Sequence, residues 1–391
     1  MQEETKTTSP TQKRWQYWLE DYWDIVVGML SIVLAIVLHN IGNGYLATFC
    51  AAIGIASLSL TVAEIAEILS ERLQEPYGSL VLTFSAVVVE IILLYIILLE
   101  AVHTPEVIET VKGGIISAVI VDMNVLLGLA VFVGGLAFTQ QEHNKETSSA
   151  YTTILLVTAT ALLVPSLLSE TEHGQNTLRE ASMLIGGLLI VFYIVIVVFQ
   201  TRTHTHFFQA TIRSRIFRIK RKMDEDNDAV DALDSGYIFE KFNNIGIFLV
   251  IFLLIGVIAL GAEVFAKDGI KMAKDYGISS GLAGLIIAII SVAPEIFTAI
   301  KAAKNDQIQR VVNIAMGAST VSILLTVPVL LVLAYISGIN LLLDFNPLQI
   351  GALILTVILA WKTTDEGHTN YFEGVSHLMF FLIYAIIAAY Y

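Results

Sequence analysis

Two glutamates lie at matching places in two strongly apolar stretches of the chain. Glu90 lies in residues 80–96 (LVLTFSAVVVEIILLYI), and Glu295 lies in residues 285–301 (LIIAIISVAPEIFTAIK). The two stretches align without gaps, and both carry Glu-Ile at the same place. Matches among valine, isoleucine and leucine arise easily by chance in apolar stretches, whereas a matching carboxylate does not. The pair therefore indicates an internal repeat with one glutamate at the centre of each copy.

Carboxylates in such surroundings can exchange a metal cation for protons. An ionised carboxylate in the middle of a bilayer costs about 2.5 kcal/mol or more, so it faces a protein interior or a water cavity and marks an ion or proton pathway. Removal from water favours the protonated form of a carboxyl group, whereas a bound cation favours the charged form. One site can therefore hold either a metal or protons, and oxygen ligands suit hard cations such as calcium.

The alternative is that each glutamate pairs with a buried basic group or stays protonated between helices. The interiors of the apolar runs contain no lysine or arginine for such a pair, which weakens this alternative. Pro294 directly precedes Glu295, and a proline removes a backbone donor from a helix. We therefore expect a broken helix there, which would offer backbone carbonyl oxygens to an ion.

The elements that must position these glutamates are helices that cross a lipid bilayer. Of the 391 residues, 56% are hydrophobic and only 15% are charged, whereas a soluble domain carries about 25% charged residues. The apolar runs are continuous and long enough for spanning helices rather than barrel strands. We expect an all-α polytopic bundle of about eleven spans, with a twelfth span or a re-entrant segment left open by one long run. The approximate limits are 24–39, 46–70, 79–101, 113–138, 151–169, 181–200, 243–266, 277–303, 308–337, 347–361 and 374–391.

The positive charges predict how the chain is oriented. With loops alternating between the two sides, 17 of the 22 lysines and arginines fall on the side of the N-terminus and five on the other. Cytoplasmic loops of membrane proteins are enriched in these residues. We therefore expect a cytoplasmic N-terminus, with Tyr391 on the outer side. The net charge of −13 speaks against a nucleic-acid partner.

A long hydrophilic stretch divides the chain into two halves. Residues 201–242 begin basic and turn acidic, and we interpret them as a cytoplasmic linker that either binds cations or is simply solvated. Residues 1–23 form a cytoplasmic tail, residues 24–200 hold the first span and a five-helix repeat, and residues 243–391 hold a second five-helix repeat. Five helices per half force opposite orientations, which is typical of the inverted repeats of secondary transporters.

Three further glutamates lie together near the cytoplasmic end of the second span. Glu64, Glu67 and Glu71 are three and four residues apart, so they share one stripe of a helix. They could guide cations from the cytoplasm toward the site, or they could form an interfacial face in contact with water.

The remaining chemistry-bearing residues show no arrangement of their own. The eight histidines are scattered without metal-ligand spacing, and we assign them no role. They are His39, His103, His143, His173, His204, His206, His368 and His377. The sequence has no His-Glu-x-x-His zinc motif. We expect neither an enzyme nor a bound cofactor.

The residues around both glutamates resemble the signature regions of the calcium/cation antiporter superfamily, and within it the bacterial ChaA-type branch of sodium (potassium), calcium–proton antiporters. The resemblance covers residues 46 to 391. The first signature is residues 75–85 (EPYGSLVLTFS), running on to Glu90. The second comprises residues 292–295 (VAPE), 301–305 (KAAKN) and 313–317 (NIAMG), followed by Ser322.

The resemblance implies that two inverted five-helix halves bring Glu90 and Glu295 to one central site for metal and protons. It also implies that companion spans supply polar oxygens to the metal. In this sequence the corresponding residues are Asp122, Asn124, Asn313, Ser319, Thr320 and Ser322. Asp122 falls where typical calcium–proton exchangers have asparagine, and Asn124 suits the ChaA-type pattern better.

Departures from the family pattern leave the cation open. The usual Gly-Asn before each glutamate is replaced by Ala86 and Val87 in the first signature and by Ser291 and Val292 in the second. The site therefore has fewer side-chain amides than calcium-dedicated members, and the cation is calcium, sodium or potassium. The resemblance implies a bacterial cell membrane and leaves the oligomeric state open.

The function that we expect is a secondary cation/proton antiporter working by alternating access. The alternative is a passive cation channel, which would predict a ring of like residues along an axis of oligomer symmetry. Two carboxylates within one internal repeat suit a carrier with a closed site better.

Overall fold

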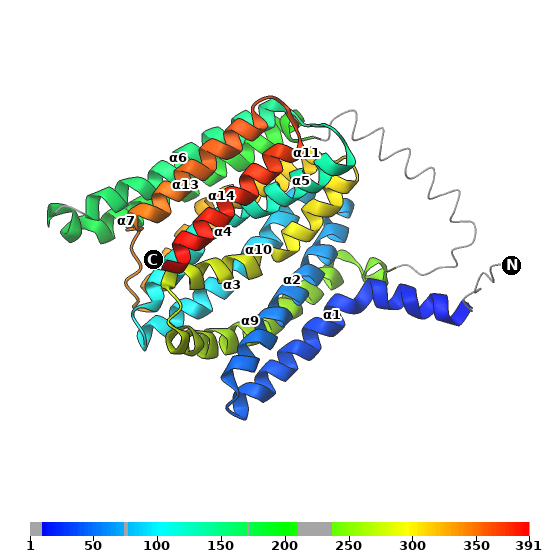
Figure 1. The fold of residues 1–391 in the computed structure, drawn as a ribbon, viewed down its shortest axis with the longest axis horizontal. Helices are drawn as coiled ribbons and strands as arrows, with labels where there is room; N and C mark the ends of the chain where they lie inside the picture. The colour runs from blue at the N-terminus through cyan, green and yellow to red at the C-terminus, as the bar shows by residue number, and fades with distance from the viewer. Residues whose placement is uncertain (1–9, 74–76, 170–171, 210–236, 391) are drawn as a thin grey trace.

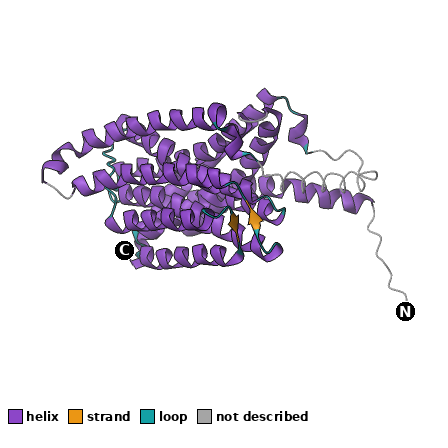
Figure 2. Cartoon of the chain, turned by 90° about the horizontal axis from the view of Figure 1, so that it is seen from above, coloured by secondary structure: helices purple, strands orange, loops and turns teal. Residues whose placement is uncertain are grey.

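The chain folds into a bundle of helices, seen in Figures 1 and 2. The computed structural model describes residues 10–73, 77–169, 172–209 and 237–390. Within these ranges, eleven helices are long and apolar enough to cross a membrane. The predicted number of spans and the all-α class are therefore confirmed. The acidic part of the linker and the start of the first signature lie outside the described residues.

The first half contains six spanning helices. Its helices and strand are α1 (Pro10–Asn40), α2 (Gly44–Leu73), α3 (Tyr77–Leu99), η1 (Glu100–Val102), α4 (Val107–Val121), η2 (Asp122–Leu126), α5 (Leu127–Ala137), β1 (Gln141–Glu142), α6 (Lys145–Ser169), α7 (Glu172–Val198) and η3 (Phe199–Thr203). The segments α4, η2 and α5 form one continuous span from Val107 to Ala137. The sixth span runs through α7 into η3.

The second half contains five spanning helices. After the short helices η4 (Thr205–Phe208) and η6 (Ile238–Lys241) come α9 (Asn244–Tyr276), α10 (Ser280–Lys304), α11 (Ile308–Val321), η7 (Ser322–Thr326), α12 (Val327–Ile336), α13 (Pro347–Thr364), β2 (His368–Thr369) and α14 (Tyr371–Tyr390). The long run that left a re-entrant segment open is one helix, because α11, η7 and α12 are continuous from Ile308 to Ile336.

The helices form two flanks around a central group. Figure 1 shows α1, α2 and α9 together on one flank and α6, α7 and α13 on the other, and these helices pack on one another. Between the flanks, α10 of the second half packs against α4 and α5 of the first half. The two halves therefore meet along the helices that carry the candidate site.

One feature of the centre occurs in both halves. η2 and η7 are five-residue π-helical segments inside otherwise regular spans. A π segment inserts an extra residue into a helix, turns the following side chains, and occurs frequently at functional sites. Their similar places in the two long spans are the structural counterpart of the repeat seen in the sequence.

The prediction of a broken helix at Pro294 is wrong. α10 runs without interruption from Ser280 to Lys304 and contains this proline. The proline leaves only the carbonyl oxygen of Ile290 without its N–H partner in the helix. A proline removes only one donor from the helix, and neighbouring hydroxyl groups and helices can compensate for it inside a membrane protein.

One predicted boundary also needs correction. The seventh span was expected to end at residue 266, but α9 continues to Tyr276. Lys267, Lys271 and Lys274 follow residue 266, and lysines are compatible with a helix. Gly277, in the left-handed region with φ 64°, does end it, because glycine adopts that conformation without strain. The first helix, α1, begins at Pro10, but its membrane-spanning part runs from Tyr22 to Asn40 and agrees with the predicted limits 24–39.

The central helices of the two halves cross at close range. A Cβ atom on Gly284 of α10 would lie 2.5 Å from the backbone nitrogen of Gly114 and 2.6 Å from the carbonyl carbon of Gly113, both in α4. Only a residue without a side chain allows this approach. The contact holds α4 and α10 close together between the site and the end where these two helices begin.

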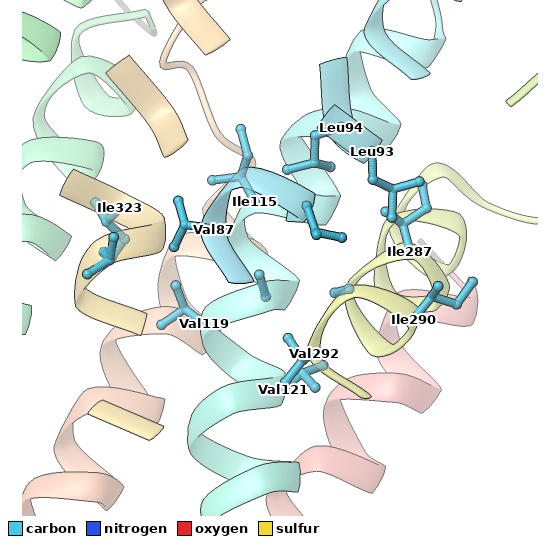
Figure 3. Close-up of a cluster of buried hydrophobic side chains, with 14 of the residues drawn as sticks. Val87, Leu93, Leu94, Ile115, Val119, Val121, Ile287, Ile290, Val292 and Ile323 are labelled. Carbon is cyan, nitrogen blue, oxygen red and sulfur yellow. The ribbon is translucent and has the colours of Figure 1, made fainter. Parts of the chain in front are cut away.

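Apolar side chains surround the centre of the bundle. Figure 3 shows residues of α3, α4, α10 and η7 in one cluster, among them Val87, Val121, Val292 and Ile323. At one end of the bundle the short strands β1 and β2 pair antiparallel, with Gln141 opposite Thr369 (Figure 2).

Candidate metal-cation and proton site

Three carboxylates from both halves of the chain line one pocket. Glu90 comes from α3, Asp122 from η2 and Glu295 from α10. Glu90 is 8% exposed and Asp122 only 1%. The other lining residues are Ala63, Ala86, Val87, Ser291, Val292, Thr298, Ile314, Ala318 and Ser322. The sequence repeat that suggested a common site for the two glutamates therefore corresponds to a common pocket.

Hydroxyl groups of the second half contact the glutamate of the first half. The Ser322 hydroxyl donates a hydrogen bond of 2.8 Å to Oε2 of Glu90, and the Thr326 hydroxyl lies 3.3 Å from the same oxygen. Both hydroxyls belong to η7. The second half of the chain therefore supplies hydrogen-bond donors to the glutamate of the first half.

Each of the three carboxyl groups has an oxygen atom that is not used by the protein. The Ser319 hydroxyl lies 3.2 Å from Oδ2 of Asp122. Within the described ranges, however, the buried oxygens Oε1 of Glu90, Oδ1 of Asp122 and Oε2 of Glu295 have no hydrogen-bond partner. Buried polar atoms are normally paired. The three oxygens are therefore available to protons, water or a cation.

Basic residues do not neutralise the pocket. None of the ion pairs in the described part of the chain involves Glu90, Asp122 or Glu295. Pairing with a buried lysine or arginine was the alternative to a transport role, and this arrangement gives it no support. In the same part of the chain, no three acidic, histidine or cysteine side chains are close enough to share one ion. Binding by all three carboxylates would therefore require a movement toward one another.

The pocket extends toward one end of the bundle. Relative to the carboxylates, Ala86, Thr298 and Ile314 lie toward the end where the linker leaves α7. We call this end the linker side. Toward the opposite end, the close crossing of α4 and α10 follows.

Two asparagines predicted as metal ligands are not among the residues that line the pocket. The Asn124 amide donates to the carbonyl oxygen of Ile120 at 3.0 Å and to the hydroxyl of Thr356 at 2.9 Å. The Asn313 amide donates to the carbonyl oxygen of Phe208 at 2.8 Å, near the start of the linker. Direct contact of either side chain with a cation would require these bonds to break.

The remaining predicted residues lie near the pocket or away from it. Thr320 is 1% exposed, and its hydroxyl has no hydrogen-bond partner in the ranges that the structure describes. Glu67 forms an ion pair with Arg310 of α11. Glu64 is half-buried on the same helix as Glu67, and the side chain of Glu71 lies outside the described residues.

Two hydroxyl residues at the site were not singled out from the sequence. Thr298 follows Glu295 by three residues and therefore shares its helix face. Thr326 follows Ser322 by four residues and contacts the same carboxylate oxygen. Helical spacing from the predicted residues was the signal that could have found both.

The described residues, with eleven helices long and apolar enough to cross a membrane, form an integral membrane protein. The sequence matches the family described as sodium/calcium exchanger protein over residues 42–202 and 246–390. The chain belongs to this family, and the resemblance expected from the signature stretches is confirmed.

Individual relatives share about a quarter of their residues with the chain. The sodium-potassium/proton antiporter ChaA of Escherichia coli (strain K12) is 26% identical over 337 residues, which cover 85% of this chain and 86% of ChaA. A Ca²⁺/H⁺ antiporter of Synechocystis is 27% identical over 305 residues, covering 76% and 78% of the two chains. One of Aphanothece halophytica is 25% identical over 275 residues, covering 68% and 70%.

Solved structures share the fold. Native YfkE matches with a TM-score of 0.76 at 20% identity and covers 94% of this chain and 100% of its own. The H⁺/Ca²⁺ exchanger CAX matches with a TM-score of 0.64 at 14% identity, covering 95% and 92%. At these identities the matches support the arrangement of the helices alone.

Proposed function

We propose that the protein is a secondary active antiporter that exchanges a metal cation for protons at a site built on Glu90 and Glu295. The observation that carries this proposal is the meeting of these glutamates with Asp122 in one buried pocket. Carboxylates that face each other out of water bind either protons or a cation. Because the same oxygens serve both, the two kinds of ion compete, and this competition couples their movements.

Calcium is the cation that we propose first. Carboxylate and hydroxyl oxygens are hard ligands, and calcium takes six to eight oxygen ligands in a flexible geometry. The Ca²⁺/H⁺ antiporters among the relatives support calcium, whereas ChaA supports sodium and potassium. Ser319 and Ser322 are the hydroxyl residues nearest to the carboxylates. Asn124 and Asn313 would join them only after rearrangement.

Transport would follow alternating access of the pocket to the two sides of the membrane. The pocket extends toward the linker side, and the crossing of α4 and α10 lies on the other side. We propose that the linker side is cytoplasmic, because the order of spans in the sequence assigns 17 of the 22 lysines and arginines to that side. The kinship with bacterial antiporters supports a location in a bacterial cell membrane.

The test is proton movement in proteoliposomes that contain the purified protein. Addition of calcium, sodium or potassium to one side should drive protons in the opposite direction. Glu90→Gln and Glu295→Gln should each lower the maximal rate by about 100-fold or more. Each substitution removes a carboxylate that would bind both the cation and a proton, so the movement of both ions should fall. Glu100→Gln is the matched control. Glu100 comes directly after α3, the helix that contains Glu90, but it does not line the pocket.

Three outcomes distinguish the alternatives. Full exchange by either Gln variant would reject the glutamate site. Cation movement without proton movement would favour the passive channel. Exchange of sodium or potassium without calcium would keep the antiporter and change its cargo.

A further inference from the structure

A buried histidine lies beside the candidate site without lining it. His377 of α14 has no solvent-exposed surface. Its Nδ1 atom is 3.0 Å from Oδ1 of Asn124, and its Nε2 atom is 2.9 Å from the hydroxyl oxygen of Thr363. The ring therefore connects α14 to the π segment η2 on one side and to α13 on the other.

The hydrogen bonds of this group determine which ring nitrogen carries the proton. The Asn124 atom that faces the Ile120 carbonyl must be the amide nitrogen, because two carbonyl oxygens cannot bond to each other. The amide oxygen of Asn124 is then the atom that faces His377. Nδ1 must therefore donate a hydrogen bond to Asn124, and in a neutral ring Nε2 accepts one from Thr363. A neutral histidine satisfies both bonds, and both polar atoms of Asn124 are used.

Asn124 and the carboxylate Asp122 lie in the same five-residue π segment, η2. Residues two apart in such a segment point to nearly opposite sides of the helix. Asp122 lines the pocket, and Asn124 is bonded to α13 and α14. Fixing Asn124 therefore also fixes the direction in which Asp122 points.

The other half of the protein holds its π segment differently. In η7, Ser322 and Thr326 bond directly to the carboxylate of Glu90. In η2, Asp122 accepts a hydrogen bond from Ser319 in the pocket, and Asn124 makes further bonds to α13 and α14 away from the pocket. The first-half segment is thus held by α13 and α14 in addition to its bond at the site.

We infer that His377 is a positioning residue, which holds Asn124 and thereby keeps Asp122 directed into the cation pocket. This inference rests on the proposed antiport function. It gives a role to a side chain that the transport chemistry leaves unused. A residue that orients a metal ligand in this way typically changes metal affinity 10–100-fold when it is replaced.

A matched control separates positioning from simple helix packing. Tyr384 also lies on α14, and its hydroxyl is 3.1 Å from the hydroxyl of Ser117 on α4. Tyr384→Phe therefore removes a buried hydrogen bond between α14 and the same long span, away from η2. If His377 served only to pack α14 against its neighbours, substitutions at His377 and at Tyr384 should change the apparent KM for the cation by similar amounts.

The experiment measures the apparent KM and the maximal rate of calcium-driven proton movement in proteoliposomes. His377→Leu should raise the KM by about 10-fold, with a smaller change in maximal rate. Tyr384→Phe should leave the KM close to the wild-type value. In an Asp122→Asn background, His377→Leu should add no further increase, because its effect acts through Asp122.

Two conservative variants keep the test valid if His377→Leu fails to fold. The amide of His377→Asn lies near the position of Nδ1 and can still donate to Asn124, whereas the amide of His377→Gln lies nearer the position of Nε2. The His377→Asn variant should keep an apparent KM for the cation close to the wild-type value, whereas the His377→Gln variant should show a raised KM.

Equal KM changes in His377→Leu and Tyr384→Phe would overturn the inference. A further rise in KM when His377→Leu is added to Asp122→Asn would also overturn it, as would a lower KM in His377→Gln than in His377→Asn. A wild-type protein without cation-driven proton movement would instead reject the proposed function. The two failures are therefore distinguishable.

Discussion

The hydroxyl of Ser322 donates a hydrogen bond of 2.8 Å to Oε2 of Glu90. Ser322 belongs to the second half of the chain and Glu90 to the first, so this bond crosses the interface between the halves. Alternating access requires the halves to move relative to each other. The bond between these residues is therefore one that a transport cycle must break or replace.

Removal of the Ser322 hydroxyl should weaken the binding of the cation. Ser322→Ala leaves Glu90 with one donor fewer, and a hydrogen bond of this kind contributes about 1 kcal/mol or more. We expect the apparent KM for the cation to rise about fivefold in proteoliposome assays. Ser117→Ala, which removes a buried hydroxyl of α4 outside the pocket, should not change it. A similar KM in both variants would contradict a role for Ser322.

A methyl group at the crossing of α4 and α10 should destabilise the bundle. In Gly284→Ala the new Cβ would lie 2.5 Å from the backbone nitrogen of Gly114, so the helices must separate. Overpacking of this kind costs about 1–3 kcal/mol, and thermal unfolding in detergent should show a lower midpoint. Gly256→Ala is the control, because a Cβ on that residue of α9 has no atom within 4 Å. Equal midpoints would mean that the crossing can relax.

The stability of the protein should fall in acid through His143, which lies in the loop after α5. Burial, with a contribution from His368, lowers the pKa of His143 to about 4, whereas the pKa of an unfolded histidine is about 6.5. The unfolded chain therefore binds more protons between these values. The stabilising contribution is complete above pH 6.5 and is lost as the pH falls toward 4.

Thermal or denaturant unfolding at pH 7.5 and pH 5 tests this expectation. The wild type should lose up to about 2 kcal/mol through His143 over this interval. In His143→Leu, the free energy of unfolding should fall less between pH 7.5 and pH 5, and the difference from the wild type should equal the contribution of His143. Replacement of the exposed His103 by leucine should leave the loss unchanged. An identical pH dependence of wild type and His143→Leu would refute the prediction.

The ion pair between Glu67 and Arg310 argues against a large role of Glu67 in guiding cations. The side chains are 36% and 38% exposed, and such a pair contributes about 0–1 kcal/mol. Glu67→Gln should therefore change the apparent KM by less than about twofold and lower the stability by less than about 1 kcal/mol. A large increase in KM at low ionic strength that disappears in high salt would restore the guiding role.

The amino-acid sequence alone determined the class of the protein and the centre of its site. Long apolar runs need no tertiary contact to be recognised, because a bilayer requires about 20 apolar residues per helix. The two glutamates stood out for the same reason, since an ionisable group is costly among such residues. The number of spans and the shared pocket of Glu90 and Glu295 followed from these features.

The tertiary structure decided which polar groups meet the glutamates. A π segment adds one residue to a turn and rotates the side chains beside it, and composition does not reveal where this happens. Asp122 therefore lines the pocket while Asn124, two residues further, bonds to His377. Contacts of this kind join residues far apart in the chain, so only the packed helices bring them together.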